Sequence, residues 1–133
     1  MISVGVVRAK NSKNVMENNM NIKIITEKIS QPELKELAKE FYVEMVKGVA
    51  DIEKNIIALG GEWHMDANEV LIKAESEQEN LWGFNIYIDK PKKERLEYNS
   101  LINIRPKQGN KSMEIENEEI RNKIFKIVNN LVE

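Results

Sequence analysis

The stretch "NIKIITEKISQPELKEL", residues 21–37, predicts a strand followed directly by a helix. Its first half alternates between two faces and is rich in β-branched isoleucine, which favours a strand. Ser30 can then act as the N-cap of a helix, and Glu33, three residues later, completes a capping box. A proline falls in the first turn, where its missing N–H costs nothing. Ile29 and Leu34 occupy the positions of a hydrophobic staple, so four local signals agree on this helix start.

This helix is expected to be long. Apolar residues recur at spacings of three and four and form one stripe for the side of a core. Gly48 is only a mild break, and Asn55 can adopt the left-handed conformation that ends a helix. The sequence therefore predicts one N-terminal helix that continues to about Asn55. The stripe consists of Leu34, Leu37, Ala38, Phe41, Met45, Val46 and Val49.

Residues 56–75, "IIALGGEWHMDANEVLIKAE", are compatible with two structures. As a strand, they would run to Asp66, with a bulge or a close backbone approach at the two glycines. As a helix, they would begin at Asp66 as N-cap, with Glu69 completing a second capping box. We favour a strand as far as Asp66 and leave residues 67–75 open between the two.

The remainder of the chain predicts more strands and a final helix. Strands are expected at residues 81–88, 96–104 and 113–115, separated by polar turns. Asn117 can cap a last helix. Its apolar stripe consists of Ile120, Ile124, Ile127, Val128 and Leu131. The order predicts an α+β fold: a mainly antiparallel sheet of about four to five strands, with the long N-terminal helix and the C-terminal helix packed on it.

Length and composition suit one cytoplasmic domain. The chain has 133 residues, of which 20–133 form the predicted domain and 1–19, rich in Asn, Lys and Ser, a flexible extension. The formal charge of −2 gives no general attraction to nucleic acid or an anionic membrane. The absence of cysteine excludes disulfides, thiol nucleophiles and cysteine-based zinc sites. No apolar run is long enough to span a bilayer, and no signal peptide is evident, so we expect a cytoplasmic location and no membrane partner.

Three stretches together resemble an uncharacterised prokaryotic family known as domain of unknown function 5674. They are "DIEKNIIALGGEWHMDAN", "ENLWGFNIYIDKP" and "SLINIRPKQGNKSMEI", the last followed by a helix. The resemblance covers about residues 20–133 and implies no mechanism, because the family carries no established activity. It points to three motif patches, at residues 60–66, 81–83 and 103–112. Trp63 and Met65 stand where smaller or aliphatic residues are expected.

The first candidate site is the triplet Glu62, His64 and Asp66, which includes the only histidine of the chain. On a strand, this spacing places all three side chains on one face, with neighbours about 6.5–7 Å apart. A carboxylate beside the imidazole could orient the ring and make it a general base, which would make the triplet catalytic. His64 and Asp66 could also hold a divalent metal, with help from other residues. The simpler alternative, the polar face of a half-exposed strand, is favoured about two to one.

The second candidate site is the loop "NIRPKQGNKS", residues 103–112. Cationic side chains and loop N–H groups can form an anion-binding concavity. The segment 89–111 holds seven Lys and Arg against three Asp and Glu, a local charge of +4. An ordinary hairpin turn with a solvated face is an equally good interpretation. The expected ligand-binding residues are Arg105, Lys107, Gln108, Asn110 and Ser112.

Trp82, beside Gly83, is the third candidate, as an exposed stacking platform for a base. A tryptophan on a strand is more often part of the core or of an interface, by about three to one.

These features favour a ligand-binding domain or a hydrolase-like enzyme in which the histidine patch acts on an anionic substrate held by Arg105. The alternative is a non-catalytic module, similar to small toxins, that binds nucleic acid or protein through its basic loops. The expected partners are an anionic small molecule or RNA, and exposed strand edges suggest a homodimer.

Overall fold

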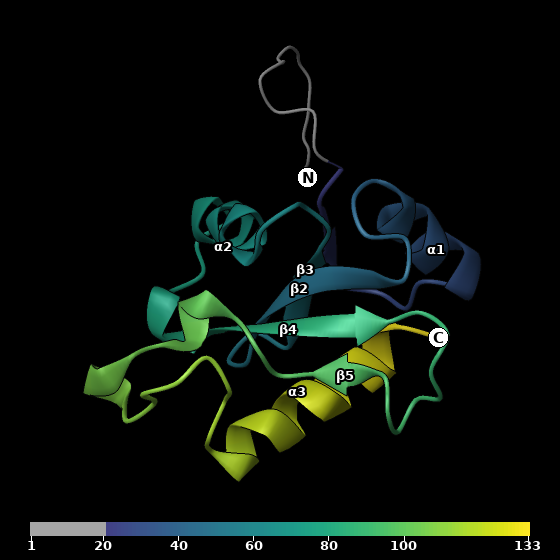
Figure 1. Cartoon of the computed structure of the whole chain (residues 1–133). Helices are drawn as coiled ribbons and strands as arrows, with labels where there is room; N and C mark the ends of the chain where they lie inside the picture. Colours follow the sequence, from purple (N-terminus) through teal and green to yellow (C-terminus); the bar gives the residue numbers. More distant parts are fainter. Residues whose placement is uncertain (1–20) are drawn as a thin grey trace.

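A five-stranded antiparallel sheet forms the centre of the fold (Figure 1). The computed structural model describes residues 21–133, so the expected flexible extension at 1–19 lies outside the described residues. The strand order is β1-β3-β2-β4-β5, and every neighbouring pair is antiparallel. The predicted α+β class and mainly antiparallel sheet are therefore confirmed. The strands are β1 (Lys23–Ile25), β2 (Met45–Asp51), β3 (Ile56–Leu59), β4 (Leu81–Tyr87) and β5 (Leu96–Glu97).

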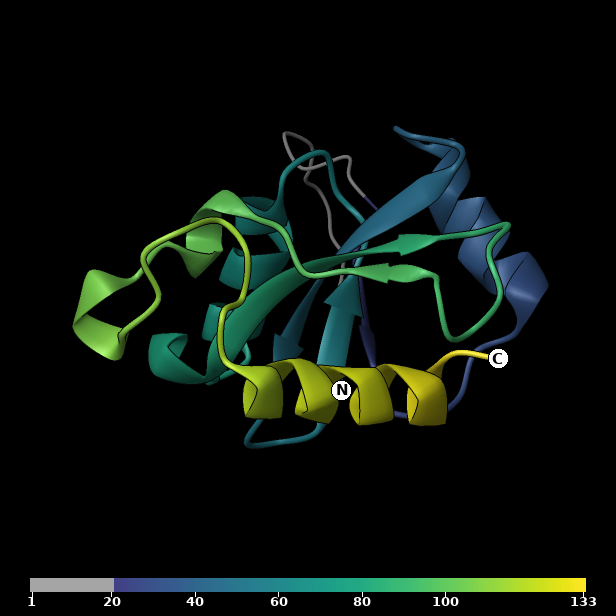
Figure 2. The ribbon, with the colours of Figure 1, turned by 60° about the horizontal axis from the view of Figure 1, so that its bottom comes forward.

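In the described part of the chain, three α-helices cover the two faces of the sheet: α1 (Gln31–Lys39), α2 (His64–Lys73) and α3 (Glu118–Leu131). The apolar residues of α1 and α3 join one large core cluster, as expected for the first and last helices, whereas α2 packs on the opposite face (Figures 1 and 2). Three short 3-10 helices complete the fold: η1 (Gln78–Asn80), η2 (Leu101–Asn103) and η3 (Pro106–Gln108). No helix within residues 21–133 is long and apolar enough to cross a membrane.

The start of α1 agrees with the sequence, but its length does not. Ser30 and Glu33 form the predicted capping box, with Ser30 N–H donating to Glu33 Oε1 at 3.0 Å. The helix ends at Lys39, and the expected long N-terminal helix is wrong. Residues 45–51 form a central strand instead. That strand is largely buried on both faces, and its apolar residues Met45, Val46 and Val49 also fit the helical spacings of three and four.

Local features of β2 explain how it packs beside β4 and turns into β3. Gly48 is required because a Cβ there would lie 2.5 Å from Phe84 Cζ. Asn55 has a φ of 60°, the left-handed conformation expected from sequence, but it lies in the hairpin turn and not at a helix end. Asp51 supports the turn, since its Oδ1 accepts hydrogen bonds from the N–H groups of Glu53 and Lys54 at 2.9 and 3.0 Å.

The strand expected up to Asp66 is also wrong. The chain leaves β3 through Gly60 and Gly61, whose φ angles of 117° and 94° interrupt an extended strand. Helix α2 then begins at His64, and Asp66 Oδ2 accepts a hydrogen bond from Trp63 N–H at 2.9 Å. The open assignment of residues 67–75 is thus resolved in favour of a helix, one turn earlier than the helical alternative proposed.

The C-terminal half is confirmed in part. Strand β4 matches the predicted strand, and Trp82, Phe84 and Ile86 all enter the larger core. The strand expected at residues 96–104 is limited to β5, and that at 113–115 is reduced to a single bridge between Asn99 and Glu114. In their place, loop side chains bond to the edge of β4. Helix α3 begins after Asn117 as predicted.

Candidate functional site

A row of polar side chains crosses the sheet on the face that carries α2. Lys47 of β2 is paired with Asn85 of β4, and Asn85 is paired with Glu97 of β5. Helix α2 covers the neighbouring part of this face through Ala67 and Leu71, which pack with apolar residues of β2, β3 and β4. The row thus lies where the cover provided by α2 ends. We call these three residues, together with His64, the polar row.

The imidazole of His64 joins α2 to this row. Its Nε2 lies 2.9 Å from Phe84 O and 2.9 Å from Asn85 Oδ1. The orientation of the Asn85 amide is fixed by its Nδ2, which donates to Glu97 Oε1 at 2.8 Å. Both groups that face Nε2 are therefore acceptors, so the neutral ring must carry its proton on Nε2. Glu97 Oε1 also accepts from Tyr87 Oη at 3.1 Å.

Burial keeps this ring neutral. His64 is 7% exposed, and desolvation lowers its pKa from 6.5 to about 4, assisted by the nearby charge of Lys47. Within residues 21–133, the fully buried side-chain nitrogens without a partner belong to Trp82 and Arg95. Because no group of these residues bonds to Nδ1 of His64, this atom is part of the small exposed surface of the ring. Within the described residues, His64 Nδ1 is thus an unpaired acceptor at neutral pH.

Lys47 supplies a half-buried positive charge beside the ring. Its Nζ lies 5.1 Å from the centroid of the Tyr42 ring, a cation–π contact. Burial lowers the pKa of Lys47, while the charge of Glu97 opposes that shift. The ion pair within 4.0 Å found in residues 21–133 joins Lys39 to Glu36, so no carboxylate of this part of the chain pairs with Lys47. An external anion could therefore contact its ammonium group.

The other two members of the predicted triplet do not join His64. Asp66 caps α2 through Trp63 N–H, and the backbone carbonyl of Glu62 accepts a hydrogen bond from Tyr42 Oη at 2.5 Å. The common strand face expected for Glu62, His64 and Asp66 is wrong, because α2 begins within the triplet. Among residues 21–133, no group of three or more His, Asp and Glu side chains is arranged to hold a metal ion. The geometry therefore gives no support to the metal site expected at His64 and Asp66.

Arg105 makes its hydrogen bonds inside the fold. Its Nε donates to Ile102 O at 3.0 Å, its Nη1 to Gln78 O at 3.0 Å, and its Nη2 to Leu81 O. The guanidinium also lies over the ring of Trp82, 4.3 Å from the centroid. Burial lowers its pKa. Arg105 therefore binds the edge of β4 near its first residue, Leu81. It does not face His64, which contacts β4 at residues 84 and 85.

Asn110 holds the rest of the predicted anion-binding loop. It is 3% exposed, and its Nδ2 donates to the carbonyls of Asn103, Ser112 and Glu114 at 2.8, 2.9 and 2.8 Å. Its Oδ1 accepts from Glu116 N–H at 2.8 Å. The amide group is thus fully used in shaping the loop.

The hydrogen-bond donors of this loop that were expected to bind an external anion instead bind acceptors of the protein itself, in particular the carboxylate of Glu116. Glu116 Oε2 accepts from Lys111 N–H at 3.2 Å and from Ser112 Oγ at 2.9 Å. Gln108 Nε2 donates to Glu79 O at 3.1 Å. Lys107, Gln108 and Ser112 are all exposed to solvent, but of these three only the side chain of Lys107 makes no hydrogen bond within residues 21–133.

Trp82 is not an exposed stacking platform. It is 2% exposed and lies in the larger core cluster, so the candidate role as a surface platform is wrong and the core interpretation favoured from the sequence is confirmed. Gly83 beside it is required by packing, because a Cβ there would lie 2.6 Å from Ser100 Cβ. The side chain of Asn103 accepts a hydrogen bond from Gly83 N–H at 2.8 Å and donates one to Gly83 O at 3.1 Å. It thus makes the two backbone hydrogen bonds that a neighbouring strand would otherwise make.

Comparison with known families identifies the family of this chain. Residues 23–131 match the family described as "Protein of unknown function (DUF5674)". The chain belongs to this family. Neither the curated proteins nor the solved structures give a match. The resemblance seen in the sequence is confirmed, and a function for this DUF5674 domain must be argued from its own residues.

In this DUF5674 domain, sequence reasoning found His64 but missed its partners. Lys47 falls within the predicted long helix, and Asn85 and Glu97 fall within predicted strands without a role. One signal was available: Asn85 is the polar residue inside the apolar run "LWGFNIYI". A buried polar side chain in a central strand needs a partner, which points to a network. The pairing of Asn85 with Glu97 depends on strand register, which no local pattern provides.

Proposed function

We propose that this domain binds a small anionic molecule at the polar row. In this proposal, His64 Nδ1 accepts a hydrogen bond from an N–H or O–H group of the ligand, and Lys47 Nζ contacts its carboxylate or phosphate. The observation that supports it is the buried, neutral imidazole of His64. Phe84 and Asn85 hold its Nε2–H, while Nδ1 has no partner within residues 21–133. An acceptor held in this way is pre-organised for a donor.

Binding is favoured over general-base hydrolysis by the same surroundings. A general base works best when its pKa is near the working pH. The pKa of His64 is lowered to about 4, so the ring accepts a hydrogen bond but is a weak base at neutral pH. A nucleic-acid surface has less support, because Arg95 and Arg105, two of the seven cations of segment 89–111, make their hydrogen bonds inside the fold.

The proposal can be tested by NMR with a panel of small carboxylates and phosphates. We expect at least one member that also carries an N–H or O–H donor to shift the amide signals of Lys47, His64, Asn85 and Glu97. Replacing Lys47 with Gln removes the charge and should weaken that ligand about tenfold, or about 1.4 kcal/mol. Lys92→Gln, at an exposed position between β4 and β5, is the control and should bind like the wild type.

Two results would count against this assignment. In one, no compound of the panel shifts the signals of the polar row. In the other, Lys47→Gln and Lys92→Gln weaken a ligand equally, which would indicate attraction to the overall charge and not to this site.

A further inference from the structure

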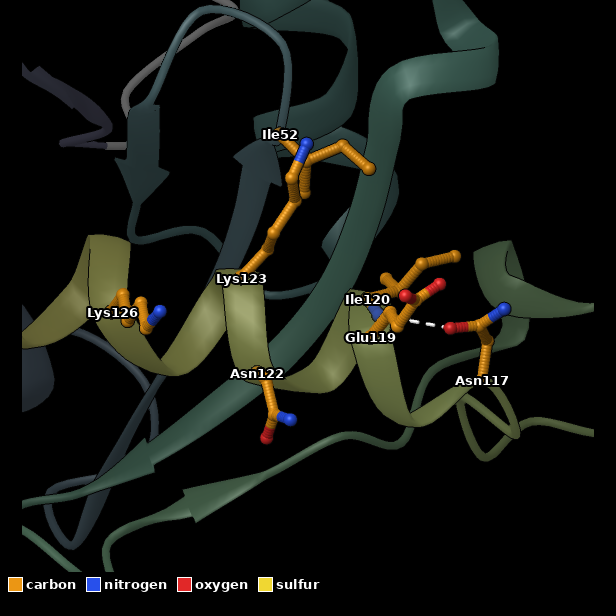
Figure 3. Close-up of a pocket in the computed structure, with 7 residues that line it drawn as sticks. All are labelled: Ile52, Asn117, Glu119, Ile120, Asn122, Lys123 and Lys126. Carbon is orange, nitrogen blue, oxygen red and sulfur yellow. Dashed lines mark hydrogen bonds between the residues drawn. The ribbon is translucent and has the colours of Figure 1, made fainter.

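A cavity of about 420 Å³ lies on the opposite side of the sheet from the polar row. It is bounded by the first turns of α3 and by Ile52, which directly follows β2 (Figure 3). Its volume falls in the range of roughly 300–1,000 Å³ found for small-molecule sites. Because α3 and α2 cover different faces, this cavity is separate from the polar row (Figure 1).

The inner wall of the cavity is apolar. Ile52 and Ile120 are half-buried and pack against the larger core cluster. Both positions are held by hydrogen bonds: Ile52 N–H donates to Asn80 O at 3.0 Å, and Ile120 N–H donates to Asn117 Oδ1 at 3.1 Å. A ligand would therefore meet a preformed hydrocarbon surface.

The rim of the cavity is positively charged. Lys123 and Lys126 stand three residues apart on α3 and so lie on neighbouring parts of the helix surface. Lys123 extends from α3 toward Ile52, whereas Asn122 points away (Figure 3). Glu119 is the carboxylate of the lining, yet within residues 21–133 neither lysine has a carboxylate within 4.0 Å. Two ammonium groups against one carboxylate favour an anionic ligand.

We propose that this cavity binds a small amphiphilic anion, a carboxylate attached to a short alkyl or aryl group. The carboxylate contacts the ammonium group of Lys123 and is attracted by the charge of Lys126 on the same rim, and the apolar part covers Ile52 and Ile120. Each component alone matches half of the cavity. An inorganic anion leaves the isoleucine wall exposed to water, and a neutral apolar molecule leaves the two lysines without a partner.

Octanoate is the probe that tests both halves, in an NMR titration of the full chain below its micelle concentration. We expect octanoate to shift the amide signals of Ile52, Ile120 and Lys123 in a saturable manner. Acetate and octanol should bind at least about tenfold more weakly, because each retains one half of the contacts. Octanoate binding should also weaken as salt is raised, since part of it is ionic.

The decisive variant is Lys123→Gln/Lys126→Gln, which keeps the length of both side chains but removes their charges. We expect it to bind octanoate about tenfold more weakly than the wild type, with little remaining salt dependence. The control is Lys92→Gln/Lys93→Gln, which removes two exposed charges outside the cavity and should leave octanoate binding unchanged.

The proposal is overturned if octanoate binds the Lys123/Lys126 variant as tightly as the wild type, or if its signal changes map to residues outside the cavity. Absence of saturable binding to the wild type overturns it as well. Shifts confined to His64 and Asn85 would assign octanoate to the polar row, and the two proposals therefore fail or succeed separately.

Discussion

At the scale of single residues, the surroundings of His64 determine which chemistry it can perform. Its Nε2–H faces two acceptors, Phe84 O and Asn85 Oδ1, both at 2.9 Å. These acceptors alone would favour the imidazolium. Burial of the ring opposes them and is the larger effect, with a smaller contribution from Lys47. The ring therefore stays neutral, and its tautomer is determined by acceptors that cannot donate to it.

This low pKa predicts how stability depends on pH. His64 has a pKa of about 4 in the folded chain and an ordinary value of 6.5 when unfolded. Between these values the unfolded chain binds more protons, so the free energy of unfolding falls as the pH is lowered from about 6.5 to 4. By pH 4.5 the loss from this group should be on the order of 2–3 kcal/mol. Urea unfolding at pH 7 and pH 4.5 measures the total change.

Comparison with His64→Gln separates His64 from the carboxylates that titrate in the same range. Glutamine keeps an N–H donor for Asn85 but takes up no proton. We expect the variant to lose about 2–3 kcal/mol less stability than the wild type over this interval. Equal losses, or an imidazole that titrates near pH 6.5 by NMR, would show that the ring is not held neutral by burial.

At the scale of elements, the sequence predicts those with local start signals. The capping box of α1, the Asn117 cap of α3 and the alternation of β4 are all found in the structure. The errors arise where periodicity was the sole guide. The apolar pattern of strand β2 is equally compatible with a helix, because the strand is largely buried on both faces. The glycine pair before α2 is equally compatible with a bulge in a continuing strand.

The candidate site was predictable only in part for the same reason. His64 stands out as the single histidine, but its partners come from three strands and meet through register. The loop at residues 103–112 illustrates the opposite problem. Its polar residues resemble an anion site, yet Asn103, Arg105 and Asn110 bond to backbone carbonyls of the fold. Sequence shows such residue types but not which acceptors they meet.

Arg95 is a further residue whose hydrogen-bond acceptors are not evident from the sequence, and it joins the start of β5 to the end of α3. It directly precedes β5 and is 2% exposed. Its Nη1 donates to Glu133 O at 2.9 Å, and its Nη2 to Val132 O at 2.9 Å and to Asn129 Oδ1 at 3.2 Å. Arg95→Lys keeps the charge but loses the planar fork, leaving carbonyls at the end of α3 unpaired. We expect a loss of about 2–3 kcal/mol in the free energy of unfolding, measured with urea.

Arg121→Lys is the matched control. Arg121 is half-exposed, and its Nη1 donates to Ile115 O and Glu116 O at 2.6 and 3.2 Å. Because water can replace those bonds, the same substitution should cost less than about 1 kcal/mol there. A similar cost at both positions would mean that the Arg95 contacts contribute little beyond those of an ordinary surface arginine.

At the scale of the whole molecule, the two faces of the sheet are covered by hydrophobic clusters of different size. Among residues 21–133, the cluster that includes α1 and α3 contains 19 buried residues, whereas the cluster beneath α2 contains five. Helix α3 contributes Ile124, Ile127, Val128 and Leu131 to its cluster, and α2 contributes Ala67 and Leu71. Helix α2 is therefore the cover that can open at the lowest cost.

Native-state hydrogen exchange should detect this inequality. We expect amides of α2 to exchange through an opening that costs less free energy than the opening that exposes β4 and α3, because fewer apolar contacts are lost. Leu71→Ala should lower the opening energy of α2 by about 2–4 kcal/mol. Ile72→Ala, a neighbour that is 40% exposed, is the control and should change it little. If α2 and α3 instead exchange with equal energies, the domain opens as one unit.

The opening of α2 would also affect the polar row. His64 is the first residue of α2, so a separate opening of this helix would disconnect the imidazole from Asn85. The strands that carry Lys47, Asn85 and Glu97 would remain paired.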